Sequence, residues 1–173
     1  WRTSGGPLVF NSIYTSEHYD ARLEQPGWSS PGFDDSAWGG VMYRGAPSQR
    51  VTAQQTVPIR NVTEYRPRSV RKLHERSYLY DFGQNMAGVT KLRLRGEAGT
   101  QLRLIHAERL REDGHADLSN IDVYFRPTDK DDLFQTDVVT LSGRDDEFMP
   151  RFNYKGFRYV EVVADRPVEL SAE

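Results

Sequence analysis

The feature of this sequence that most constrains its fold is a pair of alternating segments on either side of a glycine-bounded stretch, within residues 78–95. In the second segment Leu92 and Leu94 stand between charged residues, and this period of two is typical of a half-buried β-strand. Gly83 and Gly88 enclose the stretch between the segments, and glycine is common in tight turns because it adopts positive φ without strain. The sequence therefore predicts an antiparallel hairpin with strands at residues 78–82 and 89–95.

Short strands are predicted along the rest of the chain as well, and no stretch has the period of a helix. Leu102, Leu104 and His106 alternate with residues of the opposite face, so all three are expected to point to one side of a strand. We expect His106 to be an inward, hydrogen-bonded residue rather than a catalytic base. Further strands are predicted at residues 123–125, 134–141, 148–152 and 157–163, and together they indicate an all-β fold, an antiparallel β-sandwich.

The first third of the chain is rich in turn signals and large aromatic side chains. Pro, Gly and Asp residues surround the aromatic residues of the stretch 26–38, and we expect Trp38 to fold back onto Phe33. From residue 46 to residue 68 apolar residues become sparse and prolines frequent. This stretch, hereafter the connector, is predicted to be extended, with one edge-type strand at residues 57–62.

Charge and composition exclude several classes of protein. With 23 basic and 25 acidic residues the formal net charge is −2, so the chain has no excess of positive charge for nucleic acid or an anionic membrane. Cysteine is absent, which removes disulfides, thiolate metal sites and cysteine nucleophiles. No apolar run approaches the roughly 18 residues of a membrane helix. The start at Trp1 rather than Met leads us to expect a piece of a longer protein.

No catalytic constellation is predicted from the residues. Glycoside hydrolysis needs two carboxyl groups roughly 5 to 9.5 Å apart around the scissile bond. The carboxylates here lie in turns or polar stretches where solvation is expected, as in the cluster at residues 145–147. Neither a Gly-x-Ser-x-Gly nucleophile turn nor a phosphate-binding glycine loop with its lysine is present. We predict no catalytic residue in this chain.

Metal binding has equally little support. The four histidines lack the His-x-x-x-His spacing and a partner cysteine, so a zinc site is not predicted. Asp129, Asp131 and Asp132 are close in sequence but lack the glycine of a calcium loop. We predict no metal ligand and no cofactor, and leave a structural calcium ion open because sugar-handling β-modules often contain one.

Aromatic rings are the one binding feature that the residues offer. A flat Trp or Tyr face stacks on a sugar ring, while nearby carboxylates and amides hold the hydroxyl groups of the sugar. Packing into the core is the alternative for each ring. The candidate carbohydrate-binding residues are Trp28, Trp38, Tyr43 and Tyr124.

Several longer motifs follow one another along most of the chain. They are residues 6–14 and 17–22, Trp28 with residues 31–38, the Tyr-Asp-Phe-Gly-Gln-Asn-Met-Ala-Gly segment at residues 80–88, His-Ala-Glu at 106–108 with Leu110 and Asp113-Gly114, and residues 150–161. In this order they resemble the bacterial α-L-rhamnosidases of glycoside hydrolase family 78.

This resemblance implies a fold, a domain division and a location. Residues 1–66 are similar to the C-terminal part of the family's N-terminal β-domain plus an extended connector, and residues 67–173 to its jelly-roll or concanavalin-like β-sandwich. In that family acidic residues of an (α/α)6 barrel carry out an inverting hydrolysis, and no segment here resembles that barrel. A periplasmic or secreted location is implied in the same way.

The leading hypothesis is therefore a non-catalytic accessory β-sandwich region of an α-L-rhamnosidase, an enzyme that hydrolyses terminal α-L-rhamnose from glycans. The partners that the resemblance implies are the catalytic barrel of the same protein and, through that enzyme, a rhamnose-containing glycan, with no nucleic acid and no membrane. We expect the region to be inactive alone. The alternatives are an autonomous carbohydrate-binding module and a scaffold or interaction sandwich.

Overall fold

The computed structural model describes residues 1–124, 132–168 and 170, and their regular secondary structure is almost entirely strand, which confirms the all-β class. The strands are β1 (Arg2–Thr3), β2 (Leu8–Asn11), β3 (Glu17–Asp20), β4 (Gly39–Gly40), β5 (Ser69–His74), β6 (Ser77–Gly88), β7 (Leu92–Arg95), β8 (Gln101–Ala107), β9 (Arg109–Leu110), β10 (Ala116–Asp117), β11 (Thr136–Thr140), β12 (Asp145–Phe148) and β13 (Lys155–Ala164). The helical elements of these residues are two 3-10 turns, η1 (Ala21–Leu23) and η2 (Asp122–Tyr124), so no described helix is long and apolar enough to cross a membrane.

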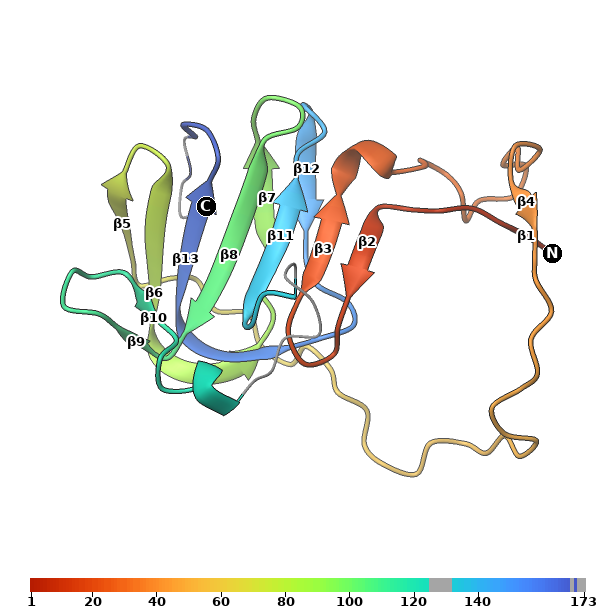
Figure 1. Ribbon diagram of the computed structural model, residues 1–173, viewed down its shortest axis with the longest axis horizontal. Coiled ribbons are helices and arrows are strands. Elements are labelled where there is room, and N and C mark those ends of the chain that lie inside the picture. The colour runs from red at the N-terminus through yellow and green to blue at the C-terminus, as the bar shows by residue number, and fades with distance from the viewer. Residues whose placement is uncertain (125–131, 169, 171–173) are drawn as a thin grey trace.

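Seven strands form one large sheet in the order β2-β3-β11-β8-β13-β6-β5 (Figure 1). Neighbours in this sheet are antiparallel except β3 and β11, which run parallel. A two-stranded antiparallel ribbon of β7 and β12 packs on one face and supplies the second layer of the sandwich. Two further pairs, β1 with β4 and β9 with β10, lie outside these layers.

The core lies between the large sheet and the ribbon. Leu102, Leu104 and His106 of β8 have no exposed surface, as their alternation predicted. Leu94 of β7 and Phe148 of β12 close the core from the other layer. Full burial of a Leu, Val or Phe side chain stabilises a fold by about 1.5–3 kcal/mol. These alternating positions therefore account for much of the free energy that holds the two layers together.

The predicted hairpin at residues 78–95 is wrong. β6 continues through the glycine-bounded stretch and pairs with β13, while β7 pairs with β12 in the other layer. Gly83 has a φ of +78° and lies where the register between β6 and β13 shifts, so that residues 82–85 stand opposite the single residue Arg158. The glycine therefore permits a bulge within one long strand rather than a turn between two strands.

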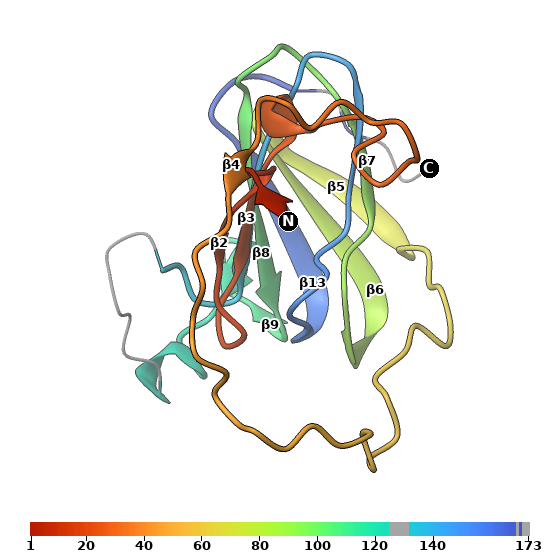
Figure 2. The same ribbon diagram turned by 90° about the vertical axis from the view of Figure 1, so that its right-hand side faces the viewer.

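The N-terminal residues join the same sheet, because β2 and β3 continue it beyond β11. Trp38 lies against Phe33 with ring centroids 5.6 Å apart, as predicted. The connector contains no strand, so the predicted edge strand at residues 57–62 is wrong. Pro58 has no amide hydrogen to donate, and for most of its length the connector runs clear of the strands in both views (Figures 1 and 2).

Smaller differences concern the second half of the chain. Residues 122–124 form η2 instead of the strand predicted at 123–125. It directly follows a turn in which the N–H groups of Ile121 and Asp122 donate to the carbonyl of Leu118; Phe125 lies outside the described residues. The strand predicted at 148–152 is wrong beyond its first residue, because β12 is Asp145–Phe148 and residues 149–152 form no strand. β11 and β13 lie within two residues of the predicted ranges at each end.

Candidate functional site

The four predicted carbohydrate-binding residues lie in separate segments. Trp28 follows η1 and is 60 % exposed, and Tyr43 lies just before the connector and is 98 % exposed. Trp38 is half-buried, because its ring packs on Phe33 and its Nε1 donates a 2.8 Å hydrogen bond to a neighbouring amide oxygen. Tyr124 ends η2. Trp28 and Tyr43 have the surface that stacking on a sugar requires, whereas the side chain of Tyr124 is not among those that the structure describes.

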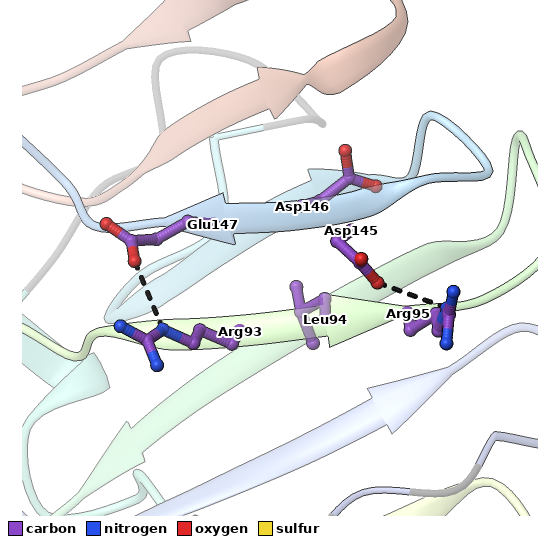
Figure 3. A pocket seen from close by; sticks show the side chains of 6 residues that line it. All are labelled: Arg93, Leu94, Arg95, Asp145, Asp146 and Glu147. Carbon is purple, nitrogen blue, oxygen red and sulfur yellow. Dashed lines mark hydrogen bonds and ion pairs between the residues drawn. The ribbon is translucent and has the colours of Figure 1, made fainter.

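An open pocket of about 440 Å³ lies on the β7–β12 ribbon, lined mainly by charged side chains from both strands (Figure 3). Arg95 and Asp145 approach to 3.1 Å, and Arg93 and Glu147 to 3.4 Å. Each pair joins residues that stand directly opposite in the ribbon. Such exposed pairs contribute at most about 1 kcal/mol, and here they neutralise one another. The pocket is therefore a ladder of cross-strand ion pairs, and with Asp146 its lining carries one net negative charge.

Among the described residues, no group of three or more His, Asp or Glu side chains is arranged to hold a metal ion. Asp129 and Asp131, two of the carboxylates considered for calcium, lie outside those residues. The third, Asp132, is buried and accepts a hydrogen bond from Thr15 Oγ1. No metal ligand can be assigned on this geometry.

A buried network of charged and polar side chains connects β3, β11 and the start of β13. Lys155 Nζ donates to Asp137 Oδ1 and to Asn153 Oδ1, both at 2.7 Å. Asp137 Oδ1 also accepts a 2.8 Å hydrogen bond from the backbone N–H of Glu17. The three charged residues are almost completely buried. Burial lowers the pKa of Lys155, and the adjacent Asp137 carboxylate opposes that effect.

This network is costly for what it contributes to stability. Within the part of the chain that the structure describes, Asp137 Oδ2 and Asn153 Nδ2 are buried without a hydrogen-bond partner. An unsatisfied buried polar atom costs about 1–3 kcal/mol, and a buried ion pair is often no more stabilising than apolar packing of the same volume. The network is therefore better explained by the backbone that it positions than by the stability that it adds.

That backbone is the loop from β12 into β13, residues 150–154, hereafter the aromatic loop. Glu17 Oε1 accepts hydrogen bonds from the N–H groups of Arg151 (2.6 Å) and Phe152 (2.7 Å), although 134 and 135 residues separate them in sequence. Asn153 is tied to Lys155 on the inner side. Phe152 and Tyr154 face outward on either side of the buried Asn153, 58 % and 57 % exposed, and Arg151 is exposed as well. Two aromatic rings are thus presented on a backbone fixed from below.

His106 has a structural role, as predicted. Its Nε2 lies 2.8 Å from Thr90 Oγ1, and its Nδ1 lies 3.2 Å from the carbonyl oxygen of Gln135. Because a carbonyl can only accept, Nδ1 carries the proton and Nε2 accepts from the threonine hydroxyl. Complete burial lowers the pKa of His106 to about 4. The ring is therefore neutral at pH 7 and has no surface that a substrate could reach.

The connector carries apolar side chains on an exposed path. Four aliphatic residues are 82–95 % exposed: Val51, Val57, Ile59 and Val62. Asn61 Nδ2 lies 3.9 Å from Met149 Sδ, immediately before the aromatic loop. Isolated exposed apolar residues are ordinary, and apolar side chains mark a surface that binds another surface where they gather into one patch.

Comparison with known proteins identifies the family of this chain. The model for the bacterial α-L-rhamnosidase concanavalin-like domain matches residues 71–172, and the model for the α-L-rhamnosidase N-terminal domain matches residues 1–63. The chain belongs to the α-L-rhamnosidase family. The fold class that the resemblance implied, a concanavalin-like β-sandwich, is confirmed.

An α-L-rhamnosidase of Streptomyces avermitilis is 42 % identical over 166 residues, which covers 94 % of this chain and 15 % of the relative. The structure of α-L-rhamnosidase from Dictyoglumus thermophilum has a TM-score of 0.84 at 36 % identity, over 99 % of this chain and 19 % of that one. The crystal structure of the S. avermitilis α-L-rhamnosidase complexed with L-rhamnose has a TM-score of 0.80 at 41 % identity, and the match covers 94 % of this chain and 15 % of that one. This rhamnosidase chain thus spans less than a fifth of these relatives and is a partial, accessory region.

Sequence reasoning missed the buried network and the loop that it holds in this rhamnosidase region. One signal was available. Lys155 lies two residues before the inward Phe157 and therefore on the same face of the strand, and a lysine on the apolar face is rare unless it is paired. Its partners were not identifiable, since Asp137 comes from β11 and Glu17 from β3, and they meet only in the folded sheet.

Proposed function

We propose that this chain is the accessory β-sandwich of an α-L-rhamnosidase that releases terminal α-L-rhamnose from glycans, and that it packs against the catalytic part of that enzyme. The observation that carries the proposal is the pair of family matches, over residues 1–63 and 71–172, on a chain that spans 15–19 % of its relatives. The side chains of the ribbon pocket also support an accessory role without catalysis. Each carboxylate of the ribbon pocket is already bonded, to Arg95, Arg93 and Ser142, so the pocket offers no carboxyl pair poised for glycoside hydrolysis.

We also propose a division near residue 66, with residues 1–66 as the end of an N-terminal β-domain plus the connector, and residues 67–173 as the sandwich. The gap between the two family matches, at residues 64–70, supports this boundary. The two parts share one sheet, because β3 pairs with β11 and β2 pairs with β3. The first part therefore packs with the second across backbone hydrogen bonds rather than standing apart from it.

The exposed connector provides the test. Its apolar side chains gain about 25 cal/mol for each Å² that a partner removes from water, and its backbone forms no strand within this chain. The experiment replaces the matched region of the S. avermitilis α-L-rhamnosidase with this chain and compares hydrogen exchange of the connector amides in the chimera and in the isolated chain. We expect protection in the chimera alone. Equal, fast exchange in both would overturn the proposed packing.

A second candidate function, carbohydrate binding by the accessory region itself, is favoured by the exposure of Trp28 and Tyr43. Trp38 and Tyr124 stay in this proposal, although the Trp38 ring is partly covered by Phe33. Titration calorimetry of the isolated chain with L-rhamnose, with and without calcium, tests it. Heat that disappears in Trp28→Ala supports binding at that ring, and no heat in either condition removes this candidate.

A further inference from the structure

We infer that the aromatic loop is a preformed docking point for the catalytic part of the α-L-rhamnosidase, with Phe152 and Tyr154 as its anchors. This inference rests on the proposed function and names the surface through which the accessory region meets its partner.

The loop is built before any partner arrives. Glu17 holds the backbone N–H groups of Arg151 and Phe152, and Lys155 holds the amide oxygen of Asn153. The side chains of Glu17 and Lys155 are almost fully buried, so water competes little for these hydrogen bonds. A loop that is already ordered loses less conformational entropy on binding, and affinity gains by that difference.

The chemistry of the loop favours an apolar protein surface over a sugar. The carboxylate of Glu17, the amide of Asn153 and the ammonium group of Lys155 are all turned inward. Outward the loop presents the rings of Phe152 and Tyr154, with the exposed side chain of Arg151 beside them. Exposed aromatic residues on a rigid backbone are typical anchors of protein interfaces. The complementary surface is an apolar hollow with one hydrogen-bond acceptor for the tyrosine hydroxyl.

Continuity with the connector identifies the occupant. Asn61 contacts Met149, which stands just before the loop, so the exposed Ile59 and Val62 approach the same region of the surface. Exposed apolar side chains of the connector and the two rings thus gather in one region, and such gathering marks an interaction surface. More than four-fifths of the length of the relatives lies outside the matched region. The rest of the same enzyme is therefore the partner to which we assign this surface.

The test uses the chimera described above and the isolated chain. Hydroxyl-radical footprinting measures oxidation of Phe152 and Tyr154, which we expect to fall at least about fivefold in the chimera. In the double variant Phe152→Ser/Tyr154→Ser, connector exchange in the chimera is expected to rise about tenfold, while the melting temperature of the isolated chain stays unchanged because both side chains are exposed. Trp28→Ser is the matched control, since its ring is 60 % exposed outside the loop. We expect it to leave connector protection intact.

The outcomes of these experiments distinguish the docking loop from the proposed packing against the catalytic part. Protection of the connector with unchanged oxidation of both rings overturns the docking loop and leaves the proposed function standing. Loss of connector protection in Trp28→Ser to the same degree as in the double variant also overturns it. An unprotected connector in the wild-type chimera overturns the proposed packing itself. In the isolated chain the Arg151 and Phe152 amides must exchange slowly, and fast exchange there refutes a preformed loop even if no chimera folds.

Discussion

Lys155 and Asp137 form an ion pair at 2.7 Å that is almost entirely withdrawn from water. Removing one partner leaves the other charge buried and unpaired, and we expect Lys155→Met to lower the free energy of unfolding by about 3–5 kcal/mol. Urea denaturation of the wild type and the variant measures this loss of unfolding free energy. The exposed Lys91→Met, which removes a surface pair with Glu147, is the control and is expected to cost less than about 1 kcal/mol.

The double variant Lys155→Met/Asp137→Asn separates loss of pairing from loss of packing. Because no net charge is left buried at the pair, we expect it to be more stable than Lys155→Met alone. A double variant that is as unstable as the sum of the two single variants would contradict the view that unpaired charge causes the damage.

Glu17 is expected to order the aromatic loop through two backbone hydrogen bonds. Hydrogen bonds to a charged group contribute about 1.5–3 kcal/mol each, so the loss of both in Glu17→Ala is expected to destabilise the fold by about 3–6 kcal/mol and to speed exchange of the Arg151 and Phe152 amides. Glu17→Gln keeps an acceptor oxygen and should lose less than half as much. Amide exchange followed by NMR checks both variants. Unchanged protection at Arg151 in Glu17→Ala would show that something else holds the loop.

His106 makes stability depend on pH in a predictable direction. The folded state holds its pKa near 4, below the ordinary value of 6.5, so the unfolded chain binds the proton first. The contribution of the neutral ring is complete above about pH 6.5 and is lost toward pH 4, at about 1.4 kcal/mol per pH unit. Between pH 7 and pH 5 we expect a loss of about 2 kcal/mol. Urea titrations at both values check this, and His106→Gln should remove that part of the slope. An identical slope in the variant would contradict it.

Gly83 and Gly88, at two points of the same strand, offer a matched pair of substitutions. Gly83 has a φ of +78°, and a Cβ there would collide with the Arg68 side chain. We expect Gly83→Ala to cost about 1–2 kcal/mol for the backbone conformation. Gly88→Ala meets no atom within 4 Å and is expected to be neutral to within about 0.5 kcal/mol. Thermal unfolding of the two variants compares them directly, and equal melting temperatures would contradict the bulge at Gly83.

Local patterns predicted the elements but not their partners. The alternation of Leu102 and Leu104 is written in neighbouring residues, and β8 was found where it was expected. The pairing of β6 with β13 joins residues such as Leu79 and Glu161, far apart in sequence, and nothing near Gly83 distinguishes a bulge from a turn. The hairpin was therefore the natural but wrong interpretation of a glycine-bounded stretch.

The candidate site was harder to predict, for the same reason. Trp38 was correctly placed on Phe33 because turn residues bring neighbours in sequence together. The aromatic loop depends on Glu17, whose carboxylate reaches it across the sheet from β3. A glutamate in a short strand looks like a solvated residue until the fold buries it.

We propose that this chain is an accessory layer of an enzyme that cleaves rhamnosides in another part of its chain. The most direct measurement is the hydrolysis of an aryl α-L-rhamnoside by the purified chain beside the intact S. avermitilis α-L-rhamnosidase. We predict no turnover above the uncatalysed rate from the chain alone and rapid release of the aryl group by the intact enzyme. Turnover by the isolated chain comparable to that of the intact enzyme would contradict the claim.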